Sequence, residues 1–293
     1  MPIEVRELTH IYNRGSTSES TALSSVSFRI EDGEFVGLIG PTGSGKSTLI
    51  QHFNGLLKPT SGSVLVDGVD IWEKGRNLRP LRQKVGLVFQ YAEQQVFEET
   101  VWEDIAFGPR NQGLPEEVVK ERVKAAAKMV GLTDEILSRS PFELSGGQLR
   151  RVAVAGVVSM KPSVLVLDEP AAGLDPKGRD DLLSYVSNMH KAGMTVILVS
   201  HNMEDVARLC QRLLVLNKGR LVADGTPREI FSRAEFIAQV GLRAPDVVTL
   251  MERLRERGFN VRTDIVNVEE AFAEITRELG GKRAAAKGAE RAL

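Results

Sequence analysis

A glycine-rich loop that ends in a lysine and a serine is the clearest chemical feature of this sequence. It reads Gly40-Pro41-Thr42-Gly43-Ser44-Gly45-Lys46-Ser47. Glycines at this spacing let backbone N–H groups converge on phosphate oxygens, and the helix expected from Thr48 adds its positive end there. Lys46 then supplies charge to the outer phosphates, and the Ser47 hydroxyl can ligate Mg²⁺. The loop therefore predicts a site for a nucleoside triphosphate.

Two adjacent acids follow an apolar run that is typical of a buried strand. The run 164–167 leads directly into Asp168 and Glu169. Because two desolvated negative charges are costly, this pair indicates a cation close by. We expect Asp168 to hold Mg²⁺ and Glu169 to polarise the water that attacks the phosphate.

Two more polar residues follow apolar runs of the same kind. Gln90 comes after the run 85–89, and His201 comes after the run 195–200. Helical patterns separate these runs, which predicts an α/β core with a mostly parallel sheet. The carboxyl ends of parallel strands share one edge of the sheet, where ligands bind. We therefore expect Gln90, the acid pair and His201 beside the phosphate loop.

A second glycine pair opens another predicted helix. It lies in the segment Ser145-Gly146-Gly147-Gln148. Uncovered N–H groups of the two glycines, with the Ser145 hydroxyl, would attract an anion. One triphosphate in a compact site does not need two complete helix ends from the same chain. We therefore infer a dimer in which each chain offers this segment to the nucleotide held by its partner.

The remaining elements frame these motifs. Strands are expected at residues 3–12, 24–30 and 35–39, with a polar loop after the first and an antiparallel start, and a largely helical insert is expected at residues 101–143. Beyond residue 241 the pattern predicts a small helical extension over 242–281. Pro245 opens its first helix, and Asn267 with Glu270 caps a second that ends at Gly280 and Gly281. We expect the tail 282–293 to be disordered.

Composition narrows the class of protein. The chain has 293 residues, 42% hydrophobic and 26% charged, with a net charge of −1, so no basic field favours nucleic acid. Its single cysteine, Cys210, excludes an internal disulfide and suits a buried apolar position. The start lacks the pattern of a secretory leader, and no apolar run is long enough to span a membrane. We expect the histidines outside the motifs to be solvated, namely His10, His52 and His190.

The order of these motifs resembles the ATP-binding-cassette ATPases over residues 1 to about 235. The resemblance implies a P-loop fold of class α/β, with a mostly parallel sheet, an N-terminal antiparallel β-subdomain and a helical subdomain at about 91–160. The nucleotide-binding domain would then span residues 1–241. It also implies a head-to-tail dimer with two ATP molecules between phosphate loops and Ser-Gly-Gly-Gln segments.

The same resemblance assigns roles to individual residues. Glu169 would be the general base, Gln90 would touch Mg²⁺ and the attacking water, and His201 would contact the γ-phosphate. The ATP contacts within the chain would be Tyr12, stacked on adenine, with Gly40, Thr42, Gly43, Ser44, Gly45, Lys46, Ser47 and Thr48. The contacts to the partner's ATP would be Ser145, Gly146, Gly147, Gln148 and Asp175. The Mg²⁺ ligands would be Ser47, Gln90 and Asp168.

A narrower resemblance is carried by residues 89–101 and 104–109. They are similar to energy-coupling-factor transporter ATPases, and more to the second ATPase subunit, A-prime, than to the first. This implies ATP-driven import of vitamins or metal ions from the cytoplasmic face of the membrane. The implied partners are a second, similar ATPase subunit in a heterodimer, a transmembrane coupling subunit and a substrate-binding membrane subunit. For contact with them we expect Tyr91 and Phe97 to be exposed and Phe107 to lie in the core.

Two alternatives keep part of this reading. A soluble ATPase of DNA repair or translation would share the motifs, but such relatives insert coiled coils or zinc modules, or carry two cassettes, and none of these patterns occurs here. A regulatory ATPase that binds ATP without hydrolysis is opposed by the complete set of Lys46, Asp168, Glu169 and His201.

Overall fold

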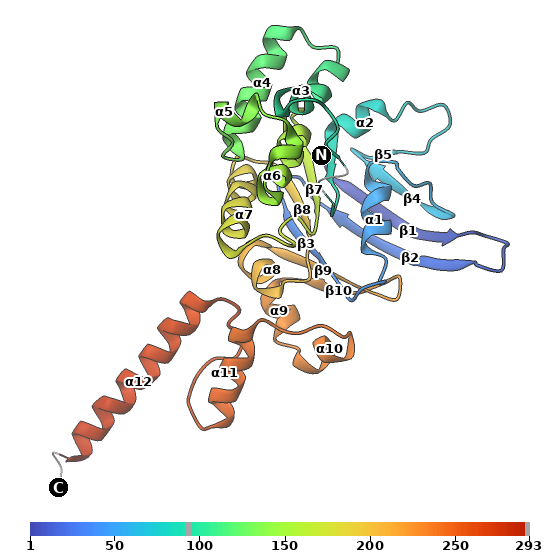
Figure 1. Ribbon diagram of the computed structural model, residues 1–293. Coiled ribbons are helices and arrows are strands. Elements are labelled where there is room, and N and C mark those ends of the chain that lie inside the picture. Colours follow the sequence, from blue (N-terminus) through green and yellow to red (C-terminus); the bar gives the residue numbers. More distant parts are fainter. Residues whose placement is uncertain (92–94, 291–293) are drawn as a thin grey trace.

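The chain folds into two β-sheets with helices packed around them, and a helical extension follows at its end (Figure 1). The computed structural model describes residues 1–91 and 95–290, with side chains described as far as Gly280. Among the described residues, no helix is both long enough and apolar enough to cross a membrane.

The larger sheet is mostly parallel, with the strand order β10-β9-β3-β8-β7-β6. Its strands are β3 (Phe35–Ile39), β6 (Val85–Val88), β7 (Val164–Asp168), β8 (Thr195–Val199), β9 (Arg212–Asn217) and β10 (Arg220–Gly225). Only β10 pairs antiparallel, along β9. All residues of β3, β6, β7 and β8 are buried, as short apolar strands covered on both faces should be. The predicted parallel core is confirmed.

Two hydrophobic clusters cover the opposite faces of this sheet. In β7, Leu165 and Leu167 join a cluster with the large helices, while Val164 and Val166 join a cluster with the antiparallel sheet. This alternation follows from the period of two residues in a strand. Because both faces are covered, a ligand can approach the sheet only at the ends of its strands.

The smaller sheet is antiparallel, with the order β2-β1-β4-β5. Its strands are β1 (Ile3–Tyr12), β2 (Ser20–Ile30), β4 (Ser61–Val66) and β5 (Val69–Asp70). Strand β2 begins earlier than residue 24, because Tyr12 and Ser20 pair and leave only the residues between them for the turn. Helix α1 (Lys46–Phe53) packs against this sheet through Leu49, Ile50 and Phe53.

The helices fall into two groups along the chain. Those between β5 and β7 are α2 (Arg79–Lys84), α3 (Val101–Asn111), α4 (Glu116–Met129), α5 (Asp134–Leu137), the 3₁₀ helix η2 (Pro141–Glu143) and α6 (Gly146–Val158). From α3 to η2 they form the helical insert predicted at residues 101–143, and together with α6 they gather at one end of the parallel sheet (Figure 1). Those after β7 and before the extension are α7 (Pro176–Lys191), α8 (Met203–Leu209), α9 (Pro227–Phe231) and α10 (Ala234–Gln239).

The extension consists of α11 (Asp246–Glu256) and α12 (Val268–Glu290) around a small apolar cluster that includes Met251 and Ile265. The predicted cap is confirmed, since Asn267 accepts the N–H of Glu270 at 2.8 Å. The predicted helix end is wrong, because α12 continues through both glycines. Glycine costs a helix only about 1 kcal/mol, and good helix formers flank the pair. Disorder of the tail 282–293 stays a prediction, and residues 291–293 lie outside the described part.

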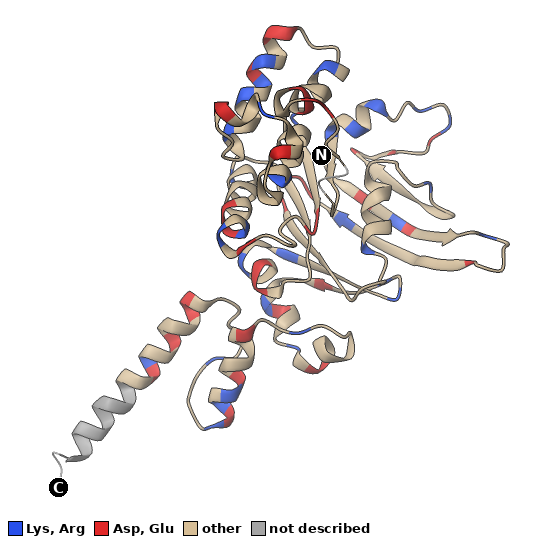
Figure 2. Cartoon of the chain, in the orientation of Figure 1, with Lys and Arg blue, Asp and Glu red and all other residues tan. Residues whose placement is uncertain are grey.

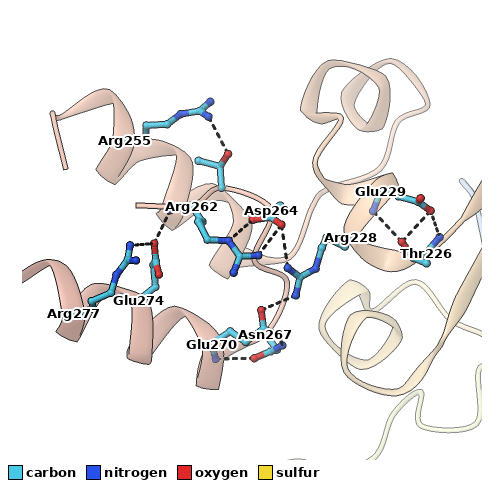
Figure 3. A network of polar contacts seen from close by, with 11 residues as sticks. Thr226, Arg228, Glu229, Arg255, Arg262, Asp264, Asn267, Glu270, Glu274 and Arg277 are labelled. Atoms are coloured by element: carbon cyan, nitrogen blue, oxygen red, sulfur yellow. Dashed lines mark hydrogen bonds and ion pairs between the residues drawn. The ribbon is translucent and has the colours of Figure 1, made fainter. Parts of the chain in front are cut away.

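Ion pairs fasten the extension to the end of the preceding domain (Figure 3). Arg228 of α9 donates to Asp264 at 3.0 Å and to Glu270 at 2.8 Å. Arg262 also pairs with Asp264 and is the main reason that the pKa of Asp264 falls to about 2. The extension thus packs within its own chain. Over the described surface, basic and acidic residues are interspersed along the helices (Figure 2).

Candidate nucleotide site

One pocket opens at the carboxyl edge of the parallel sheet, and most of the predicted site residues line it. The phosphate loop follows β3, Gln90 lies shortly after β6, the acid pair ends β7, and His201 follows β8. The lining residues predicted from sequence are Tyr12, Gly40, Thr42, Gly43, Ser44, Gly45, Lys46, Ser47, Thr48, Gln90, Asp168, Glu169 and His201. The rule that ligands bind at the carboxyl ends of parallel strands, called the strand-end rule below, therefore predicted correctly that residues from distant parts of the chain share one site.

The phosphate loop needs glycine because it runs close to its neighbours. Gly45 has φ +101°, and a Cβ there would lie 2.5 Å from the carbonyl oxygen of Ala22. A side chain at this position would therefore clash and strain the turn. The loop enters α1 without a side-chain cap, which leaves backbone N–H groups at the helix start for an anion.

The Lys46 ammonium lies inside the phosphate loop. Its Nζ donates to the carbonyl oxygens of Gly40 at 2.7 Å and Pro41 at 3.0 Å. Burial lowers the pKa of Lys46, whereas the nearby carboxylates of Glu169 and Asp168 raise it. A cation held in this position can also turn toward the oxygens of a phosphate bound by the loop.

Ser47 and Asp168 form the part of the pocket that suits a hard cation. The Ser47 hydroxyl donates to Oδ2 of Asp168 at 3.0 Å. Burial raises the pKa of Asp168, and the hydrogen bond from Ser47 and the charge of Lys46 partly oppose this. Within the described residues no cluster of His, Cys, Asp and Glu forms a cage for a metal. Few protein oxygens, completed by water and phosphate, are what Mg²⁺ usually takes, so the donor set fits Mg²⁺.

Glu169 and His201 form a close pair at the mouth of the pocket. His201 Nδ1 lies 2.7 Å from Oε2 of Glu169. Burial raises the pKa of Glu169, while the hydrogen bond and charge of His201 oppose that shift. Glu169 has φ +50°, a conformation that is unfavourable for residues other than glycine and is often retained at functional sites. A carboxylate of raised pKa is a better proton acceptor near neutral pH.

The Ser145-Gly146-Gly147-Gln148 segment lies at the start of α6 and is not part of the lining of this pocket. Ser145 and Gly146 are exposed, as is Asp175, the N-cap of α7. The helix end is less bare than predicted, because Ser145 and Gln148 form a capping box. The Ser145 hydroxyl donates to Oε1 of Gln148 at 3.2 Å, so it is engaged within its own turn.

Comparisons with known proteins identify the family. A model described as ABC transporter matches residues 23–172. The chain is 52% identical over 284 residues to the energy-coupling factor transporter ATP-binding protein EcfA2 of Caldanaerobacter subterraneus, covering 97% of this chain and 99% of that protein. It is 55% identical over 281 residues to EcfA2 of Clostridium acetobutylicum, with coverages of 95% and 98%. This chain belongs to the energy-coupling-factor ATPases of the ATP-binding-cassette family.

Solved structures agree with this assignment. Structure cbiO1 of Clostridium perfringens, described as part of the ABC transporter complex cbiONQ, superposes with a TM-score of 0.73 at 39% identity, covering 85% of this chain and 98% of that one. A dimeric ATP-binding cassette in a post-hydrolysis state, bound to ADP and Pi, gives 0.69 at 27% identity, with coverages of 77% and 98%. The predicted fold and family are confirmed, and a soluble repair or translation ATPase is not favoured.

Sequence reasoning missed Arg150, which joins three parts of the cassette. This residue of α6 is buried, and its Nη1 donates to the carbonyl oxygens of Glu169, Pro170 and Ala172 at 3.2, 3.0 and 2.7 Å. Its Nη2 donates to the carbonyl oxygen of Gln90 at 3.0 Å. One guanidinium thus links the helix that begins at Ser145 to the backbone of two predicted catalytic residues. The sequence signal was a basic residue at a position where α6 should be buried.

The prediction of solvated histidines is wrong. His52 of α1 is fully buried, His10 of β1 is almost so, and Nε2 of His52 lies 3.1 Å from Nδ1 of His10. Burial lowers the pKa of both and brings that of His52 to about 4. Tyr12 packs edge-on against His10, and its hydroxyl lies 3.2 Å from that of Thr48. The pair therefore backs the wall where Tyr12 meets the pocket. His190 is half-buried and bonds to the carbonyl oxygen of Gly33.

Proposed function

We propose that this energy-coupling-factor ATPase hydrolyses ATP in a dimer that closes around two nucleotides and thereby powers a membrane importer. The observation that carries the proposal is the division of the anion-binding groups within one chain. Lys46, Asp168 and Glu169 share a pocket, while the exposed start of α6 does not contribute to it. A second chain could supply that missing contact to each nucleotide.

Within the pocket, each residue would have a distinct part in hydrolysis. The phosphate loop and Lys46 would bind the triphosphate, and Ser47, Asp168 and Gln90 would hold Mg²⁺, which when bound would supply charge that neutralises the phosphates. Glu169 takes a proton from water as the water oxygen attacks the γ-phosphorus. The bond from that phosphorus to the bridging oxygen breaks, which releases ADP and phosphate. His201, 2.7 Å from Glu169, orients the carboxylate and is placed to contact the γ-phosphate.

The partner contacts would be those of the family. Ser145, Gly146, Gly147, Gln148 and Asp175 would approach the nucleotide held by a second, similar subunit, and we propose a heterodimer. Hydrolysis removes the phosphate that bridges both chains and so lets the dimer open, which means that ATP and ADP favour different states of the dimer. The domain units proposed are 1–241 for the ATPase, with its helical subdomain at about 91–160, and 242–281 for the extension.

An apolar groove on the helical side supports contact with a transmembrane coupling subunit. It is lined in part by Phe97 and Phe107, whose rings stack edge to face at 4.9 Å. Both are exposed, as is Tyr91, so the prediction of a core position for Phe107 is wrong. Residues 92–94 of the predicted contact segment lie outside the described part. Exposed aromatic side chains that gather in a groove mark an interaction site.

We propose that the chain lies peripherally at the cytoplasmic face of a membrane, and the groove supports this proposal. A separate membrane subunit would then choose the solute, a vitamin or a metal ion. Affinity purification of the tagged chain from native membranes, followed by identification of the co-purified subunits, tests this assembly. Recovery of this chain without any membrane subunit would contradict it.

The dimer is tested most directly by Glu169→Gln. The amide cannot accept the proton, so turnover should fall about 1,000-fold while ATP binding persists. With ATP and Mg²⁺, size-exclusion chromatography of the variant with its partner subunit should show a closed dimer that wild-type protein forms only transiently. A variant that stays monomeric under saturating ATP would contradict the proposal, and one that hydrolyses ATP normally would remove Glu169 from its role.

A further inference from the structure

An arginine from the start of the extension lies in the nucleotide pocket. Arg243 lines the pocket with Gly241 and Leu242, and His201 and Met203 also line it. No residue of this segment was expected at the site. The pocket therefore contains a side chain from outside the ATPase domain proper, and its charge bears on what the pocket binds.

The backbone holds Arg243 in a defined position. Helix α10 ends in a Schellman motif, in which Gly241 has φ +79° and Leu242 N–H donates to the carbonyl oxygen of Ile237 at 2.9 Å. Leu242 and Ala244 both pack on the large hydrophobic cluster, whereas Arg243 between them is exposed. Packing on both sides thus directs Arg243 away from the core.

The segment is also fixed beyond Arg243. Asp246 N–H, at the start of α11, donates to Oε1 of Glu204 at 3.3 Å. Glu204 belongs to α8, the helix that closely follows His201. The ion pairs of Arg228 with Asp264 and Glu270 hold the rest of the extension against α9 (Figure 3). A force on Arg243 would therefore be passed to the extension as a whole.

The charges in the pocket leave Arg243 available for an anion. Lys46 and Arg243 are the lysine and the arginine that line the pocket, together with the carboxylates of Asp168 and Glu169. Lys46 is bound to carbonyl oxygens of its own loop. Arg243, by contrast, makes no side-chain hydrogen bond or ion pair within the described part of the chain. A guanidinium matches the paired oxygens of a phosphate group.

We propose that Arg243 binds a terminal phosphate oxygen of the nucleoside triphosphate and so makes the C-terminal extension sensitive to nucleotide occupancy. This inference rests on the proposed function, because it takes the pocket to be the ATP site. It adds a contact from the extension to the groups that the family motifs supply. Loss of the terminal phosphate would release the extension from the pocket.

The test measures binding of Mg²⁺ with ADP or with the non-hydrolysable analogue AMP-PNP to the full chain by calorimetry. Arg243→Gln should weaken AMP-PNP about ten-fold, the effect of one charge-assisted hydrogen bond, and ADP less than three-fold. Arg243→Lys should recover part of the loss. Arg253→Gln, which removes an exposed arginine of α11 that does not line the pocket, is the matched control and should bind like wild type.

Hydrogen exchange supplies the second readout. AMP-PNP should slow exchange over residues 242–256 in wild-type protein and in Arg253→Gln, but not in Arg243→Gln. Equal AMP-PNP affinity of wild type and Arg243→Gln would overturn the inference, as would a variant that fails only in pairing with its partner subunit. If the wild-type chain itself did not bind AMP-PNP, the proposed function would fall first, so the two failures are distinguishable.

Discussion

The pocket around Lys46 and the amino end of α6 differ in how their polar groups are bonded. In the pocket, Ser47 bonds to Asp168, a residue far along the chain, and Glu169 pairs with His201. At the end of α6, the Ser145 hydroxyl bonds to Gln148 within the same turn. The pocket is therefore an assembly of tertiary structure. The α6 end is a local, exposed structure that can meet another chain.

The connection between the two regions is as informative as their difference. Arg150 belongs to α6, the helix that Ser145 caps, and its guanidinium donates to the carbonyl oxygens of Glu169 and Gln90. If a partner's nucleotide displaces the α6 end, as proposed, the displacement would thus reach the residues proposed for hydrolysis in the same chain. The three predictions below separate the pocket from the α6 end, beginning with the largest expected effect.

Lys46→Ala should abolish most function of the pocket. Removing the one cation at the centre of the phosphate loop should lower ATP turnover of the purified assembly by about 100-fold or more, because a preorganised charge on the phosphates is lost. The control is Lys84→Ala, which removes a surface lysine that pairs with Asp67 and does not line the pocket. Turnover within a few-fold of wild type for Lys46→Ala would mean that the phosphates lie elsewhere.

Arg150→Met should lower the rate of ATP hydrolysis while leaving the affinity for ATP nearly unchanged. The carbonyl oxygens of Glu169 and Gln90 would lose their shared donor, and misplaced hydrolytic groups should lower kcat about 10- to 100-fold. ATP affinity should change less than three-fold, since Arg150 does not line the pocket. Arg151→Met is the matched control, because that neighbour makes one long bond, of 3.4 Å, to Gly131. Equal kcat values for the two variants would show that Arg150 has no positioning role.

The buried histidines behind the pocket wall should make the stability of the folded protein sensitive to acid. The folded-state pKa of His52, about 4, lies below the ordinary value, so the folded protein binds fewer protons than the unfolded chain. The contribution of His52 to the free energy of unfolding should be fully present well above pH 6.5. It should decline as the pH falls toward 4, with a loss of about 2 kcal/mol at pH 5. Denaturant unfolding at pH 7 and pH 5 measures this loss. A His52→Leu variant with the same decline as wild type would assign it to other groups.

Many residues of the pocket could be predicted because they lie in short segments with recognisable motifs. Lys46 and Ser47 belong to one loop, Asp168 and Glu169 to one strand end, and the strand-end rule adds Gln90 and His201. The roles of these residues in hydrolysis and in contact with a partner remain proposals. Their placement around one pocket is what the structure contributes.

Other features depended on contacts between distant segments. Phe107 was expected in the core, as an aromatic side chain usually is, yet its ring is exposed beside Phe97. His10 and His52 belong to no motif, so no sequence pattern indicated that His10 of β1 and His52 of α1 would lie side by side. Gly280 suggested a helix end, but neighbouring helix formers outweighed the cost of the glycine.

By itself the sequence determined which short segments carry the chemistry: a phosphate loop, an acid pair and a helix start with two glycines, because each depends on neighbouring residues. Only the tertiary structure decided that Arg150 bridges Gln90 and Glu169, and that Arg243 of the extension enters the nucleotide pocket. These contacts join residues far apart in the chain. Which partner such a side chain reaches is set by the packing of whole elements, and no local pattern records it.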